Sequence, residues 1–361
     1  MPLFPSYTPP DFSRPELVAA PAVRVAPAPA DGVLPERFHA TSNLPEYLHL
    51  GAGRWVLVRE GRMDGALVLH HDTPEVVEPR RVRKGEPVVI ARSSRGEEGL
   101  YVHADGFTLP AAVGEAFAFR TRDTRESSFS RSYDTLYELL RHEREHGCIV
   151  WVLGPAVVFD RDSRAALAAL IAAGYCHALL AGNALPTHDL EAAHFRTGLG
   201  QDIYTRELRP GGHCNHLDII NLVRRSGSIP AAIREFDLGD GVMGACERRG
   251  VPYVLAGSIR DDGPLPGVIT DACQAQDAMR VHARRATTVI ALATQLHSIA
   301  VGNMLPGYQV DAGGAVRPVF FYVVDMTEFS VDKLANRGSL QAIPILTNVQ
   351  DFMVNLRHNL D

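Results

Sequence analysis

Lysine is almost absent from this chain of 361 residues. Lys84 and Lys333 are the only lysines among 36 Lys and Arg residues. A pyridoxal-phosphate enzyme or a Schiff-base aldolase needs a lysine amine in its active site. Lys84 lies in a region with a β-rich pattern, and Lys333 lies on a late predicted helix. Neither position suits a binding pocket, so the sequence argues against both enzyme classes.

Cysteine is scarce, and long apolar runs are missing. The five cysteines are far apart and form no CxxC pair, which argues against a disulfide framework or a four-cysteine zinc site and favours a reducing, cytoplasmic setting. No stretch approaches 18 uncharged apolar residues, so we expect no membrane span. The N-terminus has no basic segment followed by an apolar one, so it does not resemble a secretory signal.

An excess of positive charge is also absent. The 36 basic residues are outnumbered by 42 acidic ones, and the net charge of −6 argues against a nucleic-acid or acidic-membrane partner. The chain has no GxSxG elbow, Walker loop or HExxH motif either. Hydrolase, kinase and metalloprotease interpretations therefore lose their support.

Composition divides the chain into three parts. Residues 1–35 carry nine of the 24 prolines, and proline fixes φ and removes a donor, so we predict an extended arm. Residues 36–125 hold short apolar runs separated by Gly, Pro and Asp, which predicts a small β-rich domain with a structural or oligomerisation role. Residues 126–361 alternate apolar runs with helical patterns and form the predicted catalytic domain.

The apolar runs of the third part are uniformly hydrophobic. Strands of this kind, separated by helices, are typical of a parallel sheet covered on both faces, so we predict a doubly wound α/β domain. Residues 196–250 interrupt the pattern, and we expect them to form an elaborated cap. The predicted strands cover residues 148–153, 176–181, 252–256, 287–293, 319–324 and 341–346, and the clearest helices cover 133–146, 163–173, 271–284 and 329–337.

Small, amide, hydroxyl and carboxylate residues follow these strands. Ligands of an open parallel sheet bind beyond the carboxyl ends of the strands, where helix N-termini offer N–H groups to a pyrophosphate. Asp325 directly follows a strand. Its carboxylate could bind the ribose of an adenosine and favour NAD over NADP, or it could cap the next helix, as Thr327 also could. No GxGxxG motif is present, so the spacing is compatible with a dinucleotide site without establishing one.

Two further polar groups have competing interpretations. His213 and His216, with a cysteine and an aspartate nearby, suit either metal ligands or a polar loop. Without a third well-placed ligand the pattern favours the polar loop, so we expect no metal. Asp261 and Asp262 could be a pair of acid–base carboxylates. Adjacent residues rarely point to one atom, so one functional and one structural carboxylate is the better interpretation.

The strand ends belong to longer motifs. These are Leu153–Val158, Leu179–Ala184, Arg224–Ile229, Val254–Pro266, Ala275–Arg280 and Leu296–Pro306, with Pro29–Pro35 and Thr41–Pro45 in the earlier part of the chain. Together they resemble the archaeal-type ornithine cyclodeaminases. The same module forms the C-terminal part of a cyanobacterial bifunctional arginine dihydrolase/ornithine cyclodeaminase, and it has been associated with lysine-ketoglutarate reductase/saccharopine dehydrogenase.

The resemblance implies a deoxyhypusine-synthase-like NAD-binding Rossmann domain with a mainly parallel sheet, preceded by a small β-rich domain. It also implies a homo-oligomer (a dimer or tetramer), a small-molecule amino-acid substrate and the conversion of L-ornithine, or a close diamino acid, to L-proline and ammonia. The NAD contacts that it implies are Asn183, Ala184, Asp262, Thr294, Gln295, Leu296, His297, Asp325, Met326, Asn348 and Val349.

The implied reaction moves a hydride from Cα of the amino acid to NAD, lets the side-chain amine displace ammonia and then returns the hydride. The proton-acceptor candidates are Asp261, Asp262 and His297, with His213 or His216 from the inserted region. Arg260 could bind the substrate carboxylate through its two-donor fork. An NAD-dependent amino-acid dehydrogenase, an aminoalkyl transferase of the deoxyhypusine-synthase type and a non-catalytic NAD-binding protein stay open as alternatives.

Overall fold

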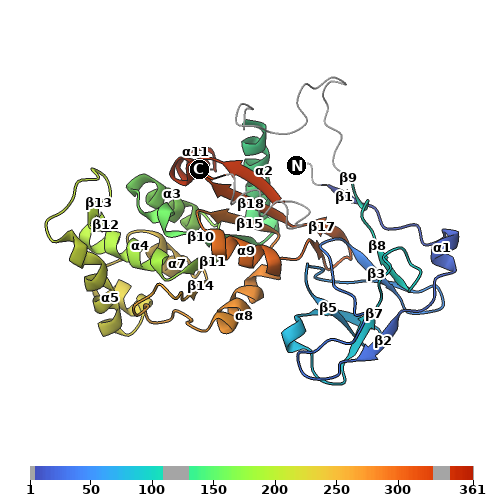
Figure 1. Cartoon of the computed structure of the whole chain (residues 1–361). Coiled ribbons are helices and arrows are strands. Elements are labelled where there is room, and N and C mark those ends of the chain that lie inside the picture. Colours follow the sequence, from blue (N-terminus) through green and yellow to red (C-terminus); the bar gives the residue numbers. More distant parts are fainter. Residues whose placement is uncertain (1–4, 109–129, 328–341, 361) are drawn as a thin grey trace.

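A parallel sheet of six strands forms the centre of the C-terminal part of the molecule (Figure 1). The computed structural model describes residues 5–108, 130–327 and 342–360. Across the sheet the strands lie in the order β14-β11-β10-β15-β18-β19, and every neighbouring pair is parallel. The strands are β10 (Ile149–Leu153), β11 (Ala178–Gly182), β14 (Tyr253–Ala256), β15 (Thr288–Leu292), β18 (Phe320–Asp325) and β19 (Ala342–Leu346).

This strand order is that of a Rossmann fold. Counted along the chain it is 3-2-1-4-5-6, and the order reverses between β10 and β15. Each of the six strands overlaps one of the apolar runs predicted as a strand. The predicted α/β fold with a mainly parallel sheet is therefore confirmed.

Side chains alternate between the two faces of the sheet, and each face has its own buried core. On β10, Trp151 belongs to the larger core, whereas Val150 and Val152 belong to the smaller one. This double cover explains why the strands are apolar on both sides. The larger core is covered mainly by α2 (Ser130–His146), α3 (Arg161–Ala172), α7 (Val242–Arg249) and α11 (Val349–Leu360), and the smaller one by α8 (Ala272–Ala283) and α9 (Gln295–Met304).

The local sequence explains where several helices begin. Asp160 caps α3 and Asp271 caps α8, because each carboxylate accepts a hydrogen bond from a backbone N–H of the first turn. The helices predicted over residues 133–146, 163–173 and 271–284 are confirmed. The helix predicted over residues 329–337 lies outside the described residues.

Between β11 and β14 the chain leaves the sheet and builds an extra layer beside α4 (Ala184–Phe195), at the left of Figure 1. This layer corresponds to residues 196–250, which interrupt the pattern of alternating strands and helices in the sequence. Helix α5 packs against both α4 and α6. The elements are β12 (Thr197–Gly198), β13 (Gln201–Asp202), η3 (Gly212–Cys214), α5 (Asn215–Ser226) and α6 (Ile229–Glu235), followed by α7.

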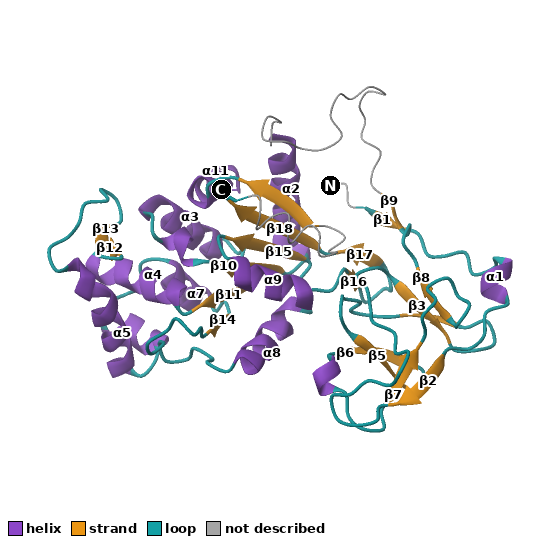
Figure 2. Cartoon of the chain, viewed as in Figure 1, coloured by secondary structure: helices purple, strands orange, loops and turns teal. Residues whose placement is uncertain are grey.

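The N-terminal part consists mainly of short strands and loops, with two short helices (Figure 2). Its main sheets have the orders β2-β7-β5-β6 and β4-β3-β8, and β1 pairs with β9. Strand β2 lies within residues 1–35 and pairs with β7, so part of the proline-rich segment belongs to a sheet. The elements are β1 (Ser6–Tyr7), α1 (Pro15–Val18), β2 (Arg24–Pro27), β3 (Glu46–His49), β4 (Trp55–Leu57), β5 (Ala66–His70), β6 (Thr73–Val77), η1 (Pro79–Arg81), β7 (Pro87–Ile90), β8 (Leu100–Val102) and β9 (Phe107–Thr108). The domain boundaries at residues 35 and 125 stay predictions.

A buried ion cluster joins the N-terminal β-rich part to α8. The carboxylate of Glu78 lies 2.8 Å from Arg62 and 2.6 Å from Arg280 of α8, and all three side chains are buried. Asp277 of α8 also pairs with Arg81 at 2.7 Å. The hairpin of β16 (Tyr308–Val310) and β17 (Val316–Pro318) also contacts the β-rich part, because the Tyr308 hydroxyl donates a hydrogen bond to the Val58 carbonyl. The two parts therefore meet along α8 and this hairpin.

Replacing Glu78 should destabilise the protein strongly. In Glu78→Gln the buried guanidinium of Arg62 loses its carboxylate partner, and that of Arg280 keeps only Asp277 at 2.9 Å. Breaking a buried pair costs about 3–5 kcal/mol of unfolding free energy. Urea unfolding followed by circular dichroism measures this loss. Glu75→Gln is the matched control, since Glu75 is exposed on β6. Equal unfolding midpoints for the two variants would contradict the role assigned to Glu78.

Candidate functional site

Two helices begin at the carboxyl edge of the sheet without a side-chain cap. Helix α4 follows Asn183, and α9 follows Thr294. Both residue types commonly cap helices, but both side chains are engaged elsewhere. The amide oxygen of Asn183 accepts the Leu265 N–H at 2.9 Å, and the Thr294 hydroxyl lies 3.2 Å from Nδ1 of His297. Helix N-termini of this kind offer N–H groups and a positive dipole to an anionic ligand.

A cavity of about 400 Å³ opens beside the start of α4. It lies between α5 and the loop after β14, and Arg260, Asp261 and Asp262 line it together with Asn183. Asp261 supports the loop: one carboxylate oxygen accepts the Ser258 N–H at 2.8 Å, and the other lies 3.5 Å from the Asn183 amide. These four predicted residues therefore share one cavity, and His216, a further proton-acceptor candidate, also lines it.

The two adjacent carboxylates have different surroundings. Asp261 is partly buried and holds the loop, whereas Asp262 is exposed at the rim of the cavity. Among the described residues, Asp262 and the side chain of Arg260 have no hydrogen bond or ion pair. This arrangement suits the interpretation of one structural and one functional carboxylate, with Asp261 in the structural position.

His297 reaches across from α9 to the end of β11. A Cβ added at Gly182 would lie 2.9 Å from the imidazole ring, so glycine at this position leaves room for His297. The ring is partly buried, and burial lowers the pKa of His297 below its usual value. The imidazole is therefore held as a neutral base or acceptor beside the start of α4.

A second group of predicted residues lies at the ends of β18 and β19. One carboxylate oxygen of Asp325 accepts both the N–H and the hydroxyl of Thr327 at 3.0 Å. The helix predicted to follow lies outside the described residues, so helix capping by Asp325 also stays a prediction. The Asn348 oxygen accepts the Gln350 N–H at 2.8 Å and so caps α11, and its amide nitrogen approaches the sulfur of Met326. The ribose contact of Asp325 stays a prediction.

The remaining predicted cofactor contacts differ in exposure. Gln295 and Leu296 are exposed on the first turn of α9, and Ala184 is partly buried at the start of α4. The Val349 side chain is buried in the larger core, so only its backbone could contact a ligand. The fold thus places the predicted cofactor contacts at the carboxyl edge of the sheet in two groups, one after β11 and β14 and one at the ends of β18 and β19. The start of α9, which follows β15, lies between the two groups in the strand order.

A cluster next to the cavity was not predicted. His188 and Glu191 of α4 and His216 of α5 place their ligand atoms within 4.8 Å of one another. Burial raises the pKa of the Glu191 carboxyl, but the neighbouring imidazoles and the Gly200 and Thr197 donors outweigh burial and lower it to about 2. The spacing of His188 and Glu191, three residues apart on one helix, was the available sequence signal.

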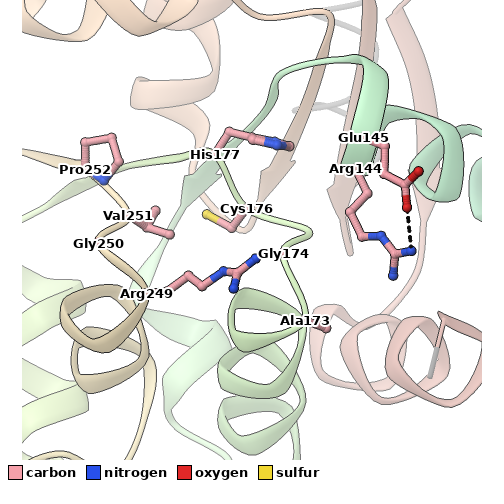
Figure 3. Close-up of a pocket in the computed structure, with 10 residues that line it drawn as sticks. All are labelled: Arg144, Glu145, Ala173, Gly174, Cys176, His177, Arg249, Gly250, Val251 and Pro252. Atoms are coloured by element: carbon pink, nitrogen blue, oxygen red, sulfur yellow. Dashed lines mark hydrogen bonds and ion pairs between the residues drawn. The ribbon is translucent and has the colours of Figure 1, made fainter.

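A hollow of about 510 Å³ lies at the opposite end of the sheet, before β11 and β14 begin (Figure 3). Its lining includes Arg144, which donates a hydrogen bond to Glu145 at 3.1 Å, together with His177 and Arg249. Parallel sheets bind their ligands at the carboxyl edge, whereas this hollow lies at the amino ends of the strands. The candidate site is therefore the cavity beside α4.

The chain is similar to known proteins over most of its length. Residues 135–356 match the family model of the arginine dihydrolase ArgZ-like C-terminal Rossmann fold. The ornithine cyclodeaminase of Methanocaldococcus jannaschii is 40% identical over 348 residues, covering 94% of this chain and 78% of that protein. The chain belongs to the ornithine cyclodeaminase family. The predicted resemblance is thereby confirmed.

Two further relatives extend the comparison. The bifunctional arginine dihydrolase/ornithine cyclodeaminase AgrE of Nostoc is 33% identical, and this chain spans 46% of it. The crystal structure of AgrE in a ternary complex with ornithine and NAD+ covers 95% of this chain with 31% identity and a TM-score of 0.58. A LOR/SDH protein of Methanococcus maripaludis has a TM-score of 0.84 at 35% identity, over 94% of this chain and 98% of the other.

The same comparisons support the Rossmann fold assigned to this family member. In the described part of the chain, no helix is both long and apolar enough to cross a membrane.

Acidification should destabilise the folded chain partly through His297. Because its pKa is lowered in the folded state, the unfolded chain binds the proton more readily, and stability is lost as the pH falls below about 6.5. His297→Gln should therefore lose less unfolding free energy than the wild type between pH 7 and pH 5.5. Urea unfolding at several pH values measures the difference. Between pH 7.5 and 8.5 the two slopes should coincide, and parallel slopes at acid pH as well would contradict the prediction.

Proposed function

We propose that the chain is an NAD-dependent ornithine cyclodeaminase that converts L-ornithine, or a close diamino acid, to L-proline, or the matching cyclic amino acid, and ammonia. Membership of the family supports this activity, as does the solved relative AgrE with ornithine and NAD+. One observation carries the proposal: an arginine and two aspartates line a cavity at the carboxyl edge of a Rossmann sheet, beside the uncapped start of α4. The predicted homo-oligomer and cytoplasmic location stay predictions.

The carboxyl edge suits NAD. The starts of α4 and α9 receive no side-chain cap and can receive the pyrophosphate, while Asp325 offers a carboxylate to a ribose. Met326, Asn348 and the Val349 backbone would lie along the same edge. The cofactor prediction agrees with the AgrE complex, which contains NAD+. When bound, NAD supplies an acceptor for the substrate's hydride and returns it later in the same cycle.

The residues of this chain bind, orient and deprotonate the amino acid. The exposed Arg260 guanidinium would pair with the substrate carboxylate through two parallel hydrogen bonds. Asp262 would take the proton released from the α-ammonium group, and Asp261 would keep the loop in place through Ser258. His297, whose pKa is lowered by burial, would accept a proton while the side-chain amine attacks Cα.

The reaction balances without an external oxidant. Oxidation at Cα gives an imine, the side-chain amine adds to that carbon, and the original α-nitrogen leaves as ammonia. Reduction of the cyclic imine at the same carbon then gives proline. Because the attacking amine comes from the substrate, no protein lysine is needed, which agrees with the near absence of lysine.

Incubation with catalytic NAD and a panel of ornithine, lysine, diaminobutyrate and hydroxylated analogues tests the function directly. Ornithine should yield proline and ammonia by mass spectrometry, with no build-up of reduced cofactor absorbance. Build-up of reduced cofactor would instead indicate a dehydrogenase, and transfer to a second amine would indicate an aminoalkyl transferase. If NAD binds and no amino acid loses ammonia, the chain is a non-catalytic NAD-binding protein.

Asp262→Asn tests the proton acceptor. The variant should lose about 100-fold or more in kcat, because general base catalysis contributes roughly 10²–10⁴-fold. Asp105→Asn is the control, since Asp105 is exposed in the β-rich part of the chain, away from the cavity. Full turnover by Asp262→Asn would remove this residue from the chemistry.

A further inference from the structure

Helices α4 and α5 bring three metal-binding side chains to one point. His188 and Glu191 are three residues apart and share a face of α4, and His216 lies on the first turn of α5. The Glu191 oxygen Oε2 lies 3.2 Å from Nδ1 of His188 and 3.8 Å from Nδ1 of His216. The two imidazole rings are 4.7 Å apart between centroids. Two nitrogens and one oxygen therefore converge from two helices.

We propose that His188, Glu191 and His216 bind a divalent transition-metal ion, with zinc preferred. Nothing in the cyclodeaminase chemistry requires this ion, so the site goes beyond the proposed function. Two histidines and one glutamate form one of the ligand sets of catalytic zinc sites. Imidazole ligands favour zinc and its neighbours over magnesium and calcium, which prefer an all-oxygen set.

The spacing is compatible with ligands of one ion, and Nδ1 of His188 also lies within hydrogen-bond distance of Oε2 of Glu191. An ion with tetrahedral ligands at about 2.1 Å separates neighbouring ligand atoms by about 3.4 Å, which lies between the two measured distances. The longer distance, from Glu191 to His216, exceeds the normal hydrogen-bond range. Nδ1 of His216 is also buried without a hydrogen-bond partner. A buried polar atom of this kind needs a partner, and an ion would supply it.

The surroundings orient the glutamate as a metal ligand needs. Its other oxygen, Oε1, accepts the Thr197 hydroxyl at 2.8 Å and the Gly200 N–H at 3.1 Å. Asn215 in turn donates to the Thr197 hydroxyl at 2.9 Å. These contacts leave Oε2 directed at the two imidazoles. Partners of this kind fix ligand orientation in metal sites.

The site has an open side toward the cavity of about 400 Å³, because His216 is also one of the residues that line that cavity. His188 and Glu191 are buried, whereas the His216 side chain keeps 35% of its surface exposed. Three protein ligands leave a fourth position for water or a bound molecule, as in zinc sites that take part in chemistry. The ion would thus lie at the wall of the cavity that contains Asp261 and Asp262.

The sequence favoured a polar loop for His216 because no third ligand lay nearby in the chain. The fold removes that objection, since both partners come from α4. The exposed neighbours His213 and Cys214 do not belong to the cluster. Within the described residues, its members are His188 and Glu191 of α4 and His216 of α5.

Metal binding to the full chain tests the proposal without reference to activity. After chelator treatment and dialysis, the wild type should take up one equivalent of Zn²⁺ per chain, measured by mass spectrometry of the metal and by titration calorimetry. Co²⁺ should give the visible absorption of a tetrahedral site. Added Zn²⁺ should also raise the melting temperature, because binding to the folded state alone stabilises it.

His216→Asn should lower the Zn²⁺ affinity by at least about 100-fold, since removal even of outer partners costs 10–100-fold. His213→Asn is the matched control, because it removes an exposed histidine outside the cluster and should bind like the wild type. Glu191→Gln should lose binding as well, and its circular dichroism spectrum without metal shows whether it folds. If Glu191→Gln does not fold, His216→Asn still tests the proposal, because His216 is partly exposed and its replacement disturbs the fold less. Absence of stoichiometric binding by the wild type, or equal affinity of His216→Asn and His213→Asn, would overturn the proposal.

Discussion

The candidate site depends on one constraint: strands that run parallel in one sheet all end at the same edge. Because both faces of this sheet are buried, the strands themselves are almost entirely apolar. Polar residues can follow only where the strands end. Asn183, Thr294, Asp325 and Asn348 are far apart in the chain, yet each lies at or just after the end of a strand of the same sheet. The fold thus concentrates chemistry at one edge, as the geometry of open α/β sheets requires.

Side chains of helix α4 point in three directions and contact a different part of the structure in each. Its start lies at the carboxyl edge beside Asn183, and His188 and Glu191 on the next turn face α5. Asp189, between them, points to the other side, where it binds Arg164 at 2.7 Å and accepts the N–H groups at the start of α7. Successive residues of a helix point in directions about 100° apart, so one short segment can support an anion site, a metal cluster and a core ion pair.

The N-terminal β-rich part is tied to the same region through α8. The loop after β14 lines the cavity, and the chain then enters α8, which carries Asp277 and Arg280. Arg280 and Arg62 share the buried carboxylate of Glu78. Removing one partner of a buried ion pair leaves an uncompensated charge and costs unfolding free energy. This contact therefore holds the two parts of the chain in one arrangement. The β-rich part therefore supports the helix that follows the cavity loop.

The sequence by itself determined the six strands, the helices with acidic N-caps and the edge where the candidate residues gather, because uniform apolar runs and caps are local signals. The family motifs added the family to which the chain belongs. Only the tertiary structure decided that Asp261 holds the loop while Asp262 is exposed and that Gly182 makes room for His297. It also decided that β2, in the proline-rich segment, pairs with β7. It also joined His216 to His188 and Glu191. Local patterns report which side chains are buried, whereas the partner of a buried side chain depends on how distant elements pack.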